Sequence, residues 1–244
     1  MPLSGTFINV VAVVAGTLAG TLLGDRLPER VRETVMHALG LVVLVVGMDA
    51  ALAAFRPPLS TLTRASVLIV LGSVLVGGIL GELLRIEDRL NSFGDTLKRR
   101  FALEHEHQAR FTEGFVVASL VFCVGPMAIL GSIENGLTGD YQLLAIKSLL
   151  DGFAALAFAS ALGWGVGFSV IPVFVYQGSI AIAASAVGDA FTPEVVAGLT
   201  ATGGILILGI GLRLLDLRQV RVGNLLPALL LAPVAVAIVQ AVVR

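Results

Sequence analysis

The sequence has few charged residues. Only 14% of its 244 residues are Asp, Glu, Lys or Arg, whereas a soluble domain of this length has about a quarter. Hydrophobic residues make up 57%, and the mean hydropathy is +0.96. This composition excludes an ordinary soluble protein and predicts a polytopic membrane protein.

Other features are absent too. Cys123 is the single cysteine, so an intramolecular disulfide is excluded and we expect this side chain to serve packing. No phosphate-binding GxxxxGK[ST] motif occurs, which argues against ATP-driven transport by this chain. The opening MPLSGTFINVVAVV has no basic residues before its apolar run, and further apolar segments follow. We therefore interpret it as a retained helix rather than a signal peptide.

Apolar stretches long enough for a transmembrane helix, about 20 residues, occur eight times. They cover residues 5–24, 34–55, 66–84, 115–131, 143–163, 167–187, 195–215 and 225–243. Little sequence remains for a soluble part. The predicted fold class is all-α: a polytopic membrane protein of about eight transmembrane helices, forming a single membrane domain over residues 1–244.

The cations are unevenly distributed between the connecting segments. Twelve of the 16 Lys and Arg residues follow odd-numbered stretches, and only Arg56, Arg64 and Arg244 follow even-numbered ones. Because short loops rich in Lys and Arg stay in the cytoplasm, we expect both termini outside it. The junction GWGVG between the fifth and sixth stretches has no charge, so it could be a tight cytoplasmic turn or a break deeper in the membrane.

The longest connection, residues 85–112, is predicted to be an amphipathic helix on the cytoplasmic membrane surface. Its apolar residues recur at helical spacing among charged ones: Ile86, Leu90, Phe93, Leu97 and Phe101. The KRR at 98–100 would then contact anionic lipid headgroups.

Short internal matches indicate repeated helical hairpins. AGTLLGDRL (19–27) resembles VGGILGELL (76–84), and VVGMDAAL (45–52) resembles CVGPMAIL (123–130). The odd-numbered stretches also carry closely spaced glycines, which let helices approach closely in lipid. We expect duplicated hairpins whose odd helices form an inner cluster. The same glycines would suit a homo-oligomer, but packing within the chain needs them as well.

Several polar residues interrupt the apolar stretches. A charged side chain costs about 2.5–3.5 kcal/mol to insert at the centre of a span, so such residues are candidates for function. The charged candidates are Asp49, Lys147 and Asp151, with Glu134 at a membrane boundary; the neutral ones are Asn9, Ser132, Asn135, Ser148, Gln177 and Ser179. Gly125 and Pro126 predict a helix break whose freed carbonyl could bind a ligand. We expect these residues to form one binding site at mid-to-outer membrane depth.

Lys147 and Asp151 are four residues apart, so they lie on one helix face and can pair. The pair could be a self-neutralising structural contact. Alternatively it could be a gate whose partners change when a proton, a cation or an anionic substrate arrives. Asp49 has no cation in its own predicted helix, so it would meet Lys147, be protonated at rest or bind a cation.

Two long segments resemble a known family. FCVGPMAILGSIENGLTGDYQLLAIKSLLDGFAALAFASALGWGVGFSVIPVFVYQGSIAI (122–182) and GTFINVVAVVAGTLAGTLLGDRLPERV (5–31) resemble the YqgA-like family of bacterial inner-membrane proteins, a domain of unknown function. The motifs VGPMAILGSI, KSLLDG and YQG occur in the family's order, and the resemblance covers nearly the whole chain. It implies a bacterial inner-membrane location, but no activity, substrate or cofactor.

The leading functional hypothesis is a secondary transporter of a small solute or ion. Asp49 and Asp151 would take the coupling cation or proton, and Lys147 would be the counter-charge or contact an anion. A channel could use the same residues, and a membrane scaffold or regulator would act through the amphipathic linker. An intramembrane enzyme would need Asp49 and Asp151 to share a proton, but no second motif accompanies them. We therefore expect no enzyme activity, cofactor, metal site or nucleic-acid partner; the expected partners are the lipid bilayer and the transported solute or ion.

Overall fold

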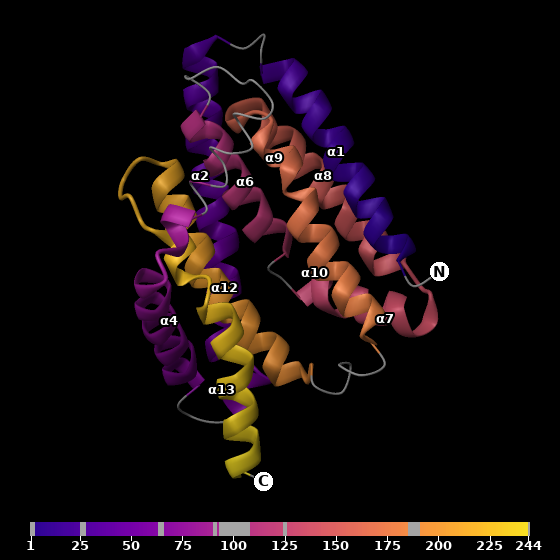
Figure 1. Ribbon diagram of the computed structural model, residues 1–244, viewed down its shortest axis with the longest axis vertical. Helices are drawn as coiled ribbons and strands as arrows, with labels where there is room; N and C mark the ends of the chain where they lie inside the picture. Colours follow the sequence, from indigo (N-terminus) through magenta and orange to yellow (C-terminus); the bar gives the residue numbers. More distant parts are fainter. Residues whose placement is uncertain are drawn as a thin grey trace. The chain divides into compact units, whose positions relative to one another are not determined.

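The computed structural model describes residues 3–24, 28–62, 66–89, 92, 108–123, 126–184 and 191–243, and all regular structure in these residues is helical (Figure 1). Within this part of the chain, seven helical segments are long and apolar enough to cross a membrane. An eighth span results if the bent pair formed by α6 (Gln108–Cys123) and α7 (Pro126–Thr138) counts as one. The prediction of an all-α polytopic protein is confirmed.

Most predicted stretches correspond to helices. The elements are α1 (Ser4–Gly24), α2 (Glu29–Ala51) followed by η1 (Leu52–Phe55) and α3 (Leu59–Leu62), α4 (Ser66–Leu83), α8 (Gln142–Leu162), α9 (Gly165–Phe168), α10 (Val170–Ile182), α12 (Pro193–Leu214), η4 (Val222–Leu225) and α13 (Ala228–Val243). Their bounds follow the apolar runs because hydropathy and length are local properties of the sequence.

The fourth predicted stretch, 115–131, is not one straight helix. Its two parts, α6 and α7, are set at 61° to each other. Pro126 is the first residue of α7, a position that proline favours because its missing N–H would have no partner there. The predicted break is therefore confirmed, and Gly125 itself lies outside the described residues.

Most of the predicted amphipathic linker, 85–112, also lies outside the described residues. Its described beginning is a turn at Leu84 and Arg85 followed by helical residues 86–89, and its described end is the first turn of α6. The predicted membrane-surface helix stays a prediction.

The chain divides into two compact units. Unit 1 comprises Met1–Leu39 and Asn91–Gly188, and unit 2 comprises Gly40–Leu90 and Asp189–Arg244. Unit 1 contains α1, α6, α7, α8, α9 and α10. Unit 2 contains η1, α3, α4, α12, η4 and α13, while α2 begins in unit 1 and ends in unit 2. Each unit has its own helix packing.

In unit 1, α1 and α8 pack side by side with their backbones in contact (Figure 1). A Cβ atom at Gly16 would lie 2.1 Å from the carbonyl oxygen of Gly152, and one at Gly20 would lie 2.3 Å from that of Leu156. The contacting residues advance together along both helices, so α1 and α8 run parallel. Glycine at every fourth position permits this approach, as predicted for the 5–24 stretch.

The uncharged junction GWGVG is a tight turn. α8 ends at Leu162, Gly163 has a φ of +75°, and α9 begins at Gly165. Glycine adopts this left-handed conformation without steric cost, and the Gly163 amide donates to the Ala159 carbonyl at the helix end. A Cβ at Gly165 would lie 1.9 Å from the carbonyl oxygen of Phe111, in the first turn of α6. The junction therefore lies beside the first turn of α6. This position at the beginning of a helix favours a tight turn between α8 and α9 over a break deep in the membrane.

In unit 2, α12 is the central helix. It contacts α13, α4, α3 and η1, and most of its residues are buried. Its glycines again allow close approach: a Cβ at Gly204 would lie 2.2 Å from the amide nitrogen of Ala51, and one at Gly211 would lie 2.7 Å from the Leu44 side chain. These contacts place the end of α2 antiparallel to α12.

Candidate functional site

The buried face of α8 carries an ion pair. Lys147 and Asp151 are 6% and 7% exposed, and they are the only buried charged residues in the part of the chain that the structure describes. The Lys147 ammonium donates a hydrogen bond to Asp151 Oδ2, as the four-residue spacing predicts. Two opposite charges taken out of water need such a partner. The pair is therefore a net-neutral unit inside a membrane-spanning helix.

Side chains from α1 and α6 enclose this pair. Asn9, on α1, lies beside the Asp151 carboxylate, although neither of its amide atoms reaches hydrogen-bond geometry. On α6, the ring centroid of Phe122 is 6.0 Å from Lys147 Nζ, the outer limit of a cation–π contact. Cys123, next to Phe122, lies near both charged side chains. The ion pair thus lies at a junction of three helices.

Two buried amide side chains in unit 1 have unsatisfied polar atoms. Asn9 on α1 and Gln177 on α10 are both 0% exposed, and both the oxygen and the nitrogen of each amide have no hydrogen-bond partner among the described residues. Buried polar atoms are nearly always paired, and leaving one unpaired costs about 1–3 kcal/mol. Groups kept at this cost are candidates for binding a ligand.

Four hydroxyls among the described residues also have no hydrogen-bond partner. Two belong to Thr6 and Thr17 of α1, and a third belongs to Ser169, the residue immediately before α10. The fourth, that of Thr200, lies in unit 2. The helices α1 and α10 are neighbours, with the rings of Phe7 and Phe174 5.6 Å apart. Most of the unsatisfied buried groups among the described residues therefore belong to one helix pair.

Asn135 and Ser132, on α7, are buried as expected but already have partners. The Gly5 amide donates to Asn135 Oδ1 at 3.2 Å, and Asn135 Nδ2 donates to Ser4 Oγ at 3.2 Å. Asn135 thereby satisfies one of the free N–H groups at the start of α1. The Ser132 hydroxyl donates to the Ala128 carbonyl within its own helix. Asn135 therefore connects α7 to the start of α1, the helix that carries Asn9.

Two predicted site residues, Glu134 and Ser179, are exposed. The Ser179 hydroxyl donates to the Tyr176 carbonyl. Of Pro126 only the backbone position is described, and Gly125 lies outside the described residues.

Asp49 also lies elsewhere, in unit 2, with its side chain 73% exposed. Arg56 Nη1 donates to Asp49 Oδ1 at 2.9 Å. None of the three predicted alternatives for Asp49, a contact with Lys147, protonation at rest or a bound cation, included this pair, because Arg56 lies just beyond the predicted 34–55 helix. The helix α2 continues into η1, and this turn brings Arg56 back to the carboxylate. Asp49 is thus a surface ion-pair partner.

Asp49→Asn is expected to change the free energy of unfolding by less than about 1 kcal/mol, because exposed ion pairs contribute about 0.2–1 kcal/mol. Thermal unfolding of the detergent-purified protein measures this, and Arg56→Gln should give a similar small change. A loss of several kcal/mol would contradict the assignment.

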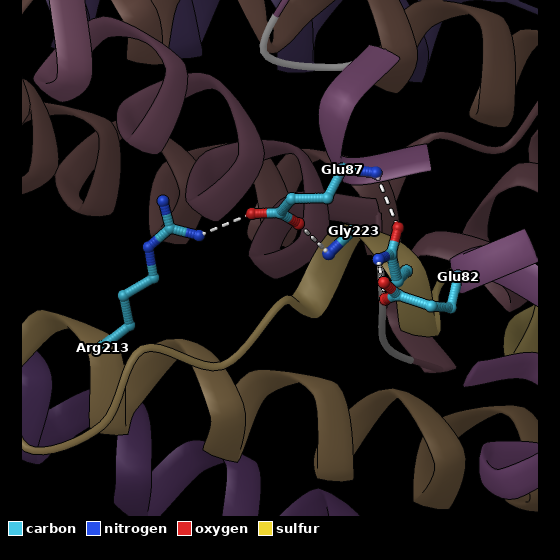
Figure 2. A network of polar contacts seen from close by, with 5 residues as sticks. Glu82, Glu87, Arg213 and Gly223 are labelled. Carbon is cyan, nitrogen blue, oxygen red and sulfur yellow. Dashed lines mark hydrogen bonds and ion pairs between the residues drawn. The ribbon is translucent and has the colours of Figure 1, made fainter. Parts of the chain in front are cut away.

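A second polar cluster, in unit 2, joins the end of α4 to α12 and η4 (Figure 2). The Glu87 carboxylate accepts from Arg213 Nη1 at 2.9 Å and from the Gly223 amide at 2.6 Å. Asn224 accepts from the Glu87 amide at 2.7 Å and donates to Glu82 at 2.6 Å. These groups satisfy one another, so the cluster fastens the connection between α12 and α13 to the end of α4.

Glu87→Gln is expected to lower the free energy of unfolding by about 1.5–3 kcal/mol, because it removes a charged acceptor that is only 13% exposed. Glu82→Gln is the matched control: its partner Arg221 is 70% exposed and Glu82 is 58% exposed, so the loss should be smaller. Chemical denaturation of both variants measures the difference. Equal losses would show that burial does not set the strength of this network.

The family described as "Protein of unknown function (DUF554)" matches residues 4–237. The chain belongs to this family. Together with the two relatives that follow, this match confirms the resemblance to YqgA-like proteins.

Two relatives cover the DUF554 chain almost completely. The "Uncharacterized membrane protein YdfK" of Bacillus subtilis (strain 168) is 31% identical over 237 residues, 97% of each chain. The "Uncharacterized protein YqgA" of Escherichia coli (strain K12) is 34% identical over 231 residues, 93% of this chain and 94% of the relative. No solved structure matches the chain. The name of YdfK agrees with a membrane protein, and neither name gives an activity.

Proposed function

We propose that this DUF554 protein is a secondary transporter that moves a small solute or ion across the membrane, with its binding site in unit 1. The observation that carries the proposal is the buried Lys147–Asp151 pair beside Asn9, which together with Gln177 presents unsatisfied amide atoms. Ionisable groups inside membrane helices commonly mark substrate or ion pathways.

The proposal includes a location in the bacterial inner membrane with both termini outside the cytoplasm. Its support is the concentration of Lys and Arg in the segments after odd-numbered spans. It assigns no catalytic reaction to the protein. Internal duplication and homo-oligomerisation stay predictions.

Ligand-dependent thermal stability tests the proposal. Purified wild type is heated with sodium, potassium, divalent cations or small anions over a range of pH. A ligand at 100 times its dissociation constant stabilises the folded state by about 2.7 kcal/mol. We expect one ligand class to stabilise the wild type but not Asp151→Asn. The same ligand should stabilise Asp49→Asn, because residue 49 is exposed and lies in unit 2.

Flux into proteoliposomes then separates a transporter from a channel. We expect uptake of the stabilising ligand to saturate with concentration, whereas a channel gives a linear dependence. If no ligand stabilises the wild type, and Asp151→Asn is merely less stable, the ion pair is structural and the scaffold hypothesis is preferred.

A further inference from the structure

We propose that the Lys147–Asp151 pair opens to bind a small amino acid in its zwitterionic form. The carboxylate of the solute contacts the Lys147 ammonium, the ammonium of the solute contacts the Asp151 carboxylate, and the Asn9 amide contacts both. This inference rests on the proposed transport function and names its substrate class.

Charge balance at the pair selects the class of solute. Lys147 and Asp151 are buried, and their opposite charges already cancel. A solute with a net charge would leave that charge uncompensated in the apolar interior of a membrane protein, which is costly. A zwitterion brings one charge of each sign. Each charge of the pair then exchanges one opposite charge for another, and the site stays neutral without any change of protonation.

The pair can open without the movement of a helix. Both residues lie on α8, and their hydrogen bond joins two side chains four residues apart. Lysine carries its ammonium on a flexible stem of four carbons, so rotation of the Lys147 side chain separates the two charges. A pair within one helix therefore suits a site that binds and releases its solute repeatedly.

The amide of Asn9 matches a zwitterion in both of its polar atoms. Asn9 lies beside the Asp151 carboxylate and is 0% exposed. Neither amide atom has a hydrogen-bond partner among the described residues. The amide nitrogen can donate to a carboxylate, and the amide oxygen can accept from an ammonium. A zwitterion therefore satisfies both atoms, whereas a simple anion or a simple metal cation satisfies one.

Ser148 adds an acceptor on the same face of α8. It is 1% exposed and lies three residues before Asp151. The Ser148 hydroxyl donates to the Leu144 carbonyl at 2.6 Å, so only the lone pairs of its oxygen are left for a ligand. A primary ammonium has three N–H donors, and Asp151, Asn9 and Ser148 supply three acceptors. This match favours a primary ammonium over a methylated one.

Close helix contacts limit the size of the solute. Next to Asp151, a Cβ atom at Gly152 would lie 3.2 Å from the Ala12 carbonyl oxygen on α1. On α6, the ring centroid of Phe122 is 6.0 Å from Lys147 Nζ. A large side chain on the solute would have to displace a helix or this ring. We therefore expect free glycine and alanine to bind, and free leucine and phenylalanine not to bind.

Calorimetric titration of the full-length, detergent-purified protein tests the charge requirement. Glycine is the probe, at about pH 6.5, where an α-amino group is protonated. Three analogues each lack one feature: glycinamide has no carboxylate, N-acetylglycine has no ammonium, and glycine betaine has both charges but no N–H donor. We expect glycine to bind the wild type, and each analogue to bind at least about tenfold more weakly. An analogue that binds as tightly as glycine would overturn the inference.

Asn9→Leu tests the site with a variant that keeps the ion pair. Leucine resembles asparagine in shape and removes a buried unpaired amide, so we expect a higher Tm without ligand. The Kd of glycine should rise at least about tenfold, because two hydrogen bonds to charged groups are lost. Thr200→Val is the matched control, since it removes an unpaired hydroxyl in unit 2 and should leave the Kd unchanged. An unchanged Kd in Asn9→Leu would overturn the inference.

Counterflow separates this inference from the proposed function. Proteoliposomes of phosphatidylcholine, a lipid without a primary ammonium, are loaded with unlabelled glycine or with buffer, and the uptake of labelled glycine is followed. We expect internal glycine to accelerate uptake by the wild type, and Asp151→Asn to respond like liposomes without protein. Glycine thereby extends the set of ligands with which the proposed function is tested. If glycine is neither bound nor carried but an ion shows Asp151-dependent stabilisation and flux, only the inference fails; if nothing is bound or carried, both fail.

Discussion

Asp151→Ala is expected to lower the free energy of unfolding by about 3–5 kcal/mol, because removing one partner leaves a buried charge uncompensated. Lys147 is 6% exposed, so its ammonium cannot turn to water without moving α8 away from its neighbours. Chemical denaturation in detergent measures the loss. A change below about 1 kcal/mol would mean that the pair is solvated in the membrane protein.

The double variant Lys147→Met, Asp151→Leu separates stability from function. Replacing a buried ion pair by apolar side chains is often neutral or stabilising by about 1–4 kcal/mol. We expect the double variant to regain at least the stability of the wild type and to show no ligand-dependent stabilisation and no flux. A double variant that still transports would rule out the pair as the binding site.

Gly20→Leu is expected to separate α1 from α8. A Cβ at Gly20 would lie 2.3 Å from the Leu156 carbonyl oxygen and 2.9 Å from the Ala159 Cβ. The first obstacle is backbone, so no rotamer change relieves it and the two helices must move apart. Overpacking costs typically about 1–3 kcal/mol, and we expect a loss at or above the upper end of this range. Ligand-dependent stabilisation should disappear as well, because Asn9 moves away from Asp151.

Gly72→Leu on α4 is the matched control for this substitution. A Cβ at Gly72 would have no atom within 4 Å, and surface substitutions usually change stability by no more than about 0.5 kcal/mol. Thermal unfolding of both variants in one detergent compares them. A similar loss at both positions would show that leucine itself, rather than helix contact, causes the effect.

The sequence predicted the helices well where their properties are local. The stretches 5–24 and 66–84 correspond to α1 and α4 to within a residue, because a run of apolar residues determines both the presence and the length of a span. The fourth stretch, 115–131, was predicted as one span, but it comprises parts of two helices set at an angle. Hydropathy cannot report the 61° between α6 and α7, and only Gly125 and Pro126 indicated a break.

The site was predictable in proportion to how local its contacts are. Lys147 and Asp151 pair within one helix, so their spacing was sufficient. Asp49 was misinterpreted because its partner Arg56 lies beyond the end of α2. Phe122 was missed because an aromatic residue in an apolar stretch carries no signal, although Thr6 could have been found, one turn before Asn9 on the same face of α1.

The unit 2 cluster could not have been predicted. Arg213 and Glu87 are 126 residues apart in the chain, and no pattern in one sequence relates such positions. In the sequence, Arg213 is only one of the twelve cations that follow odd-numbered stretches.

The parallel contact between α1 and α8 has a consequence for how the protein is made. α1 leaves the ribosome first, but its partner begins only at Gln142, and at about 5–20 residues per second the wait is on the order of ten seconds. During this time the polar side chains of Thr6 and Asn9 have neither α8 nor α10 to cover them. The first helix must therefore stay beside the insertion machinery, or be shielded by another membrane protein, until the second half of the chain arrives.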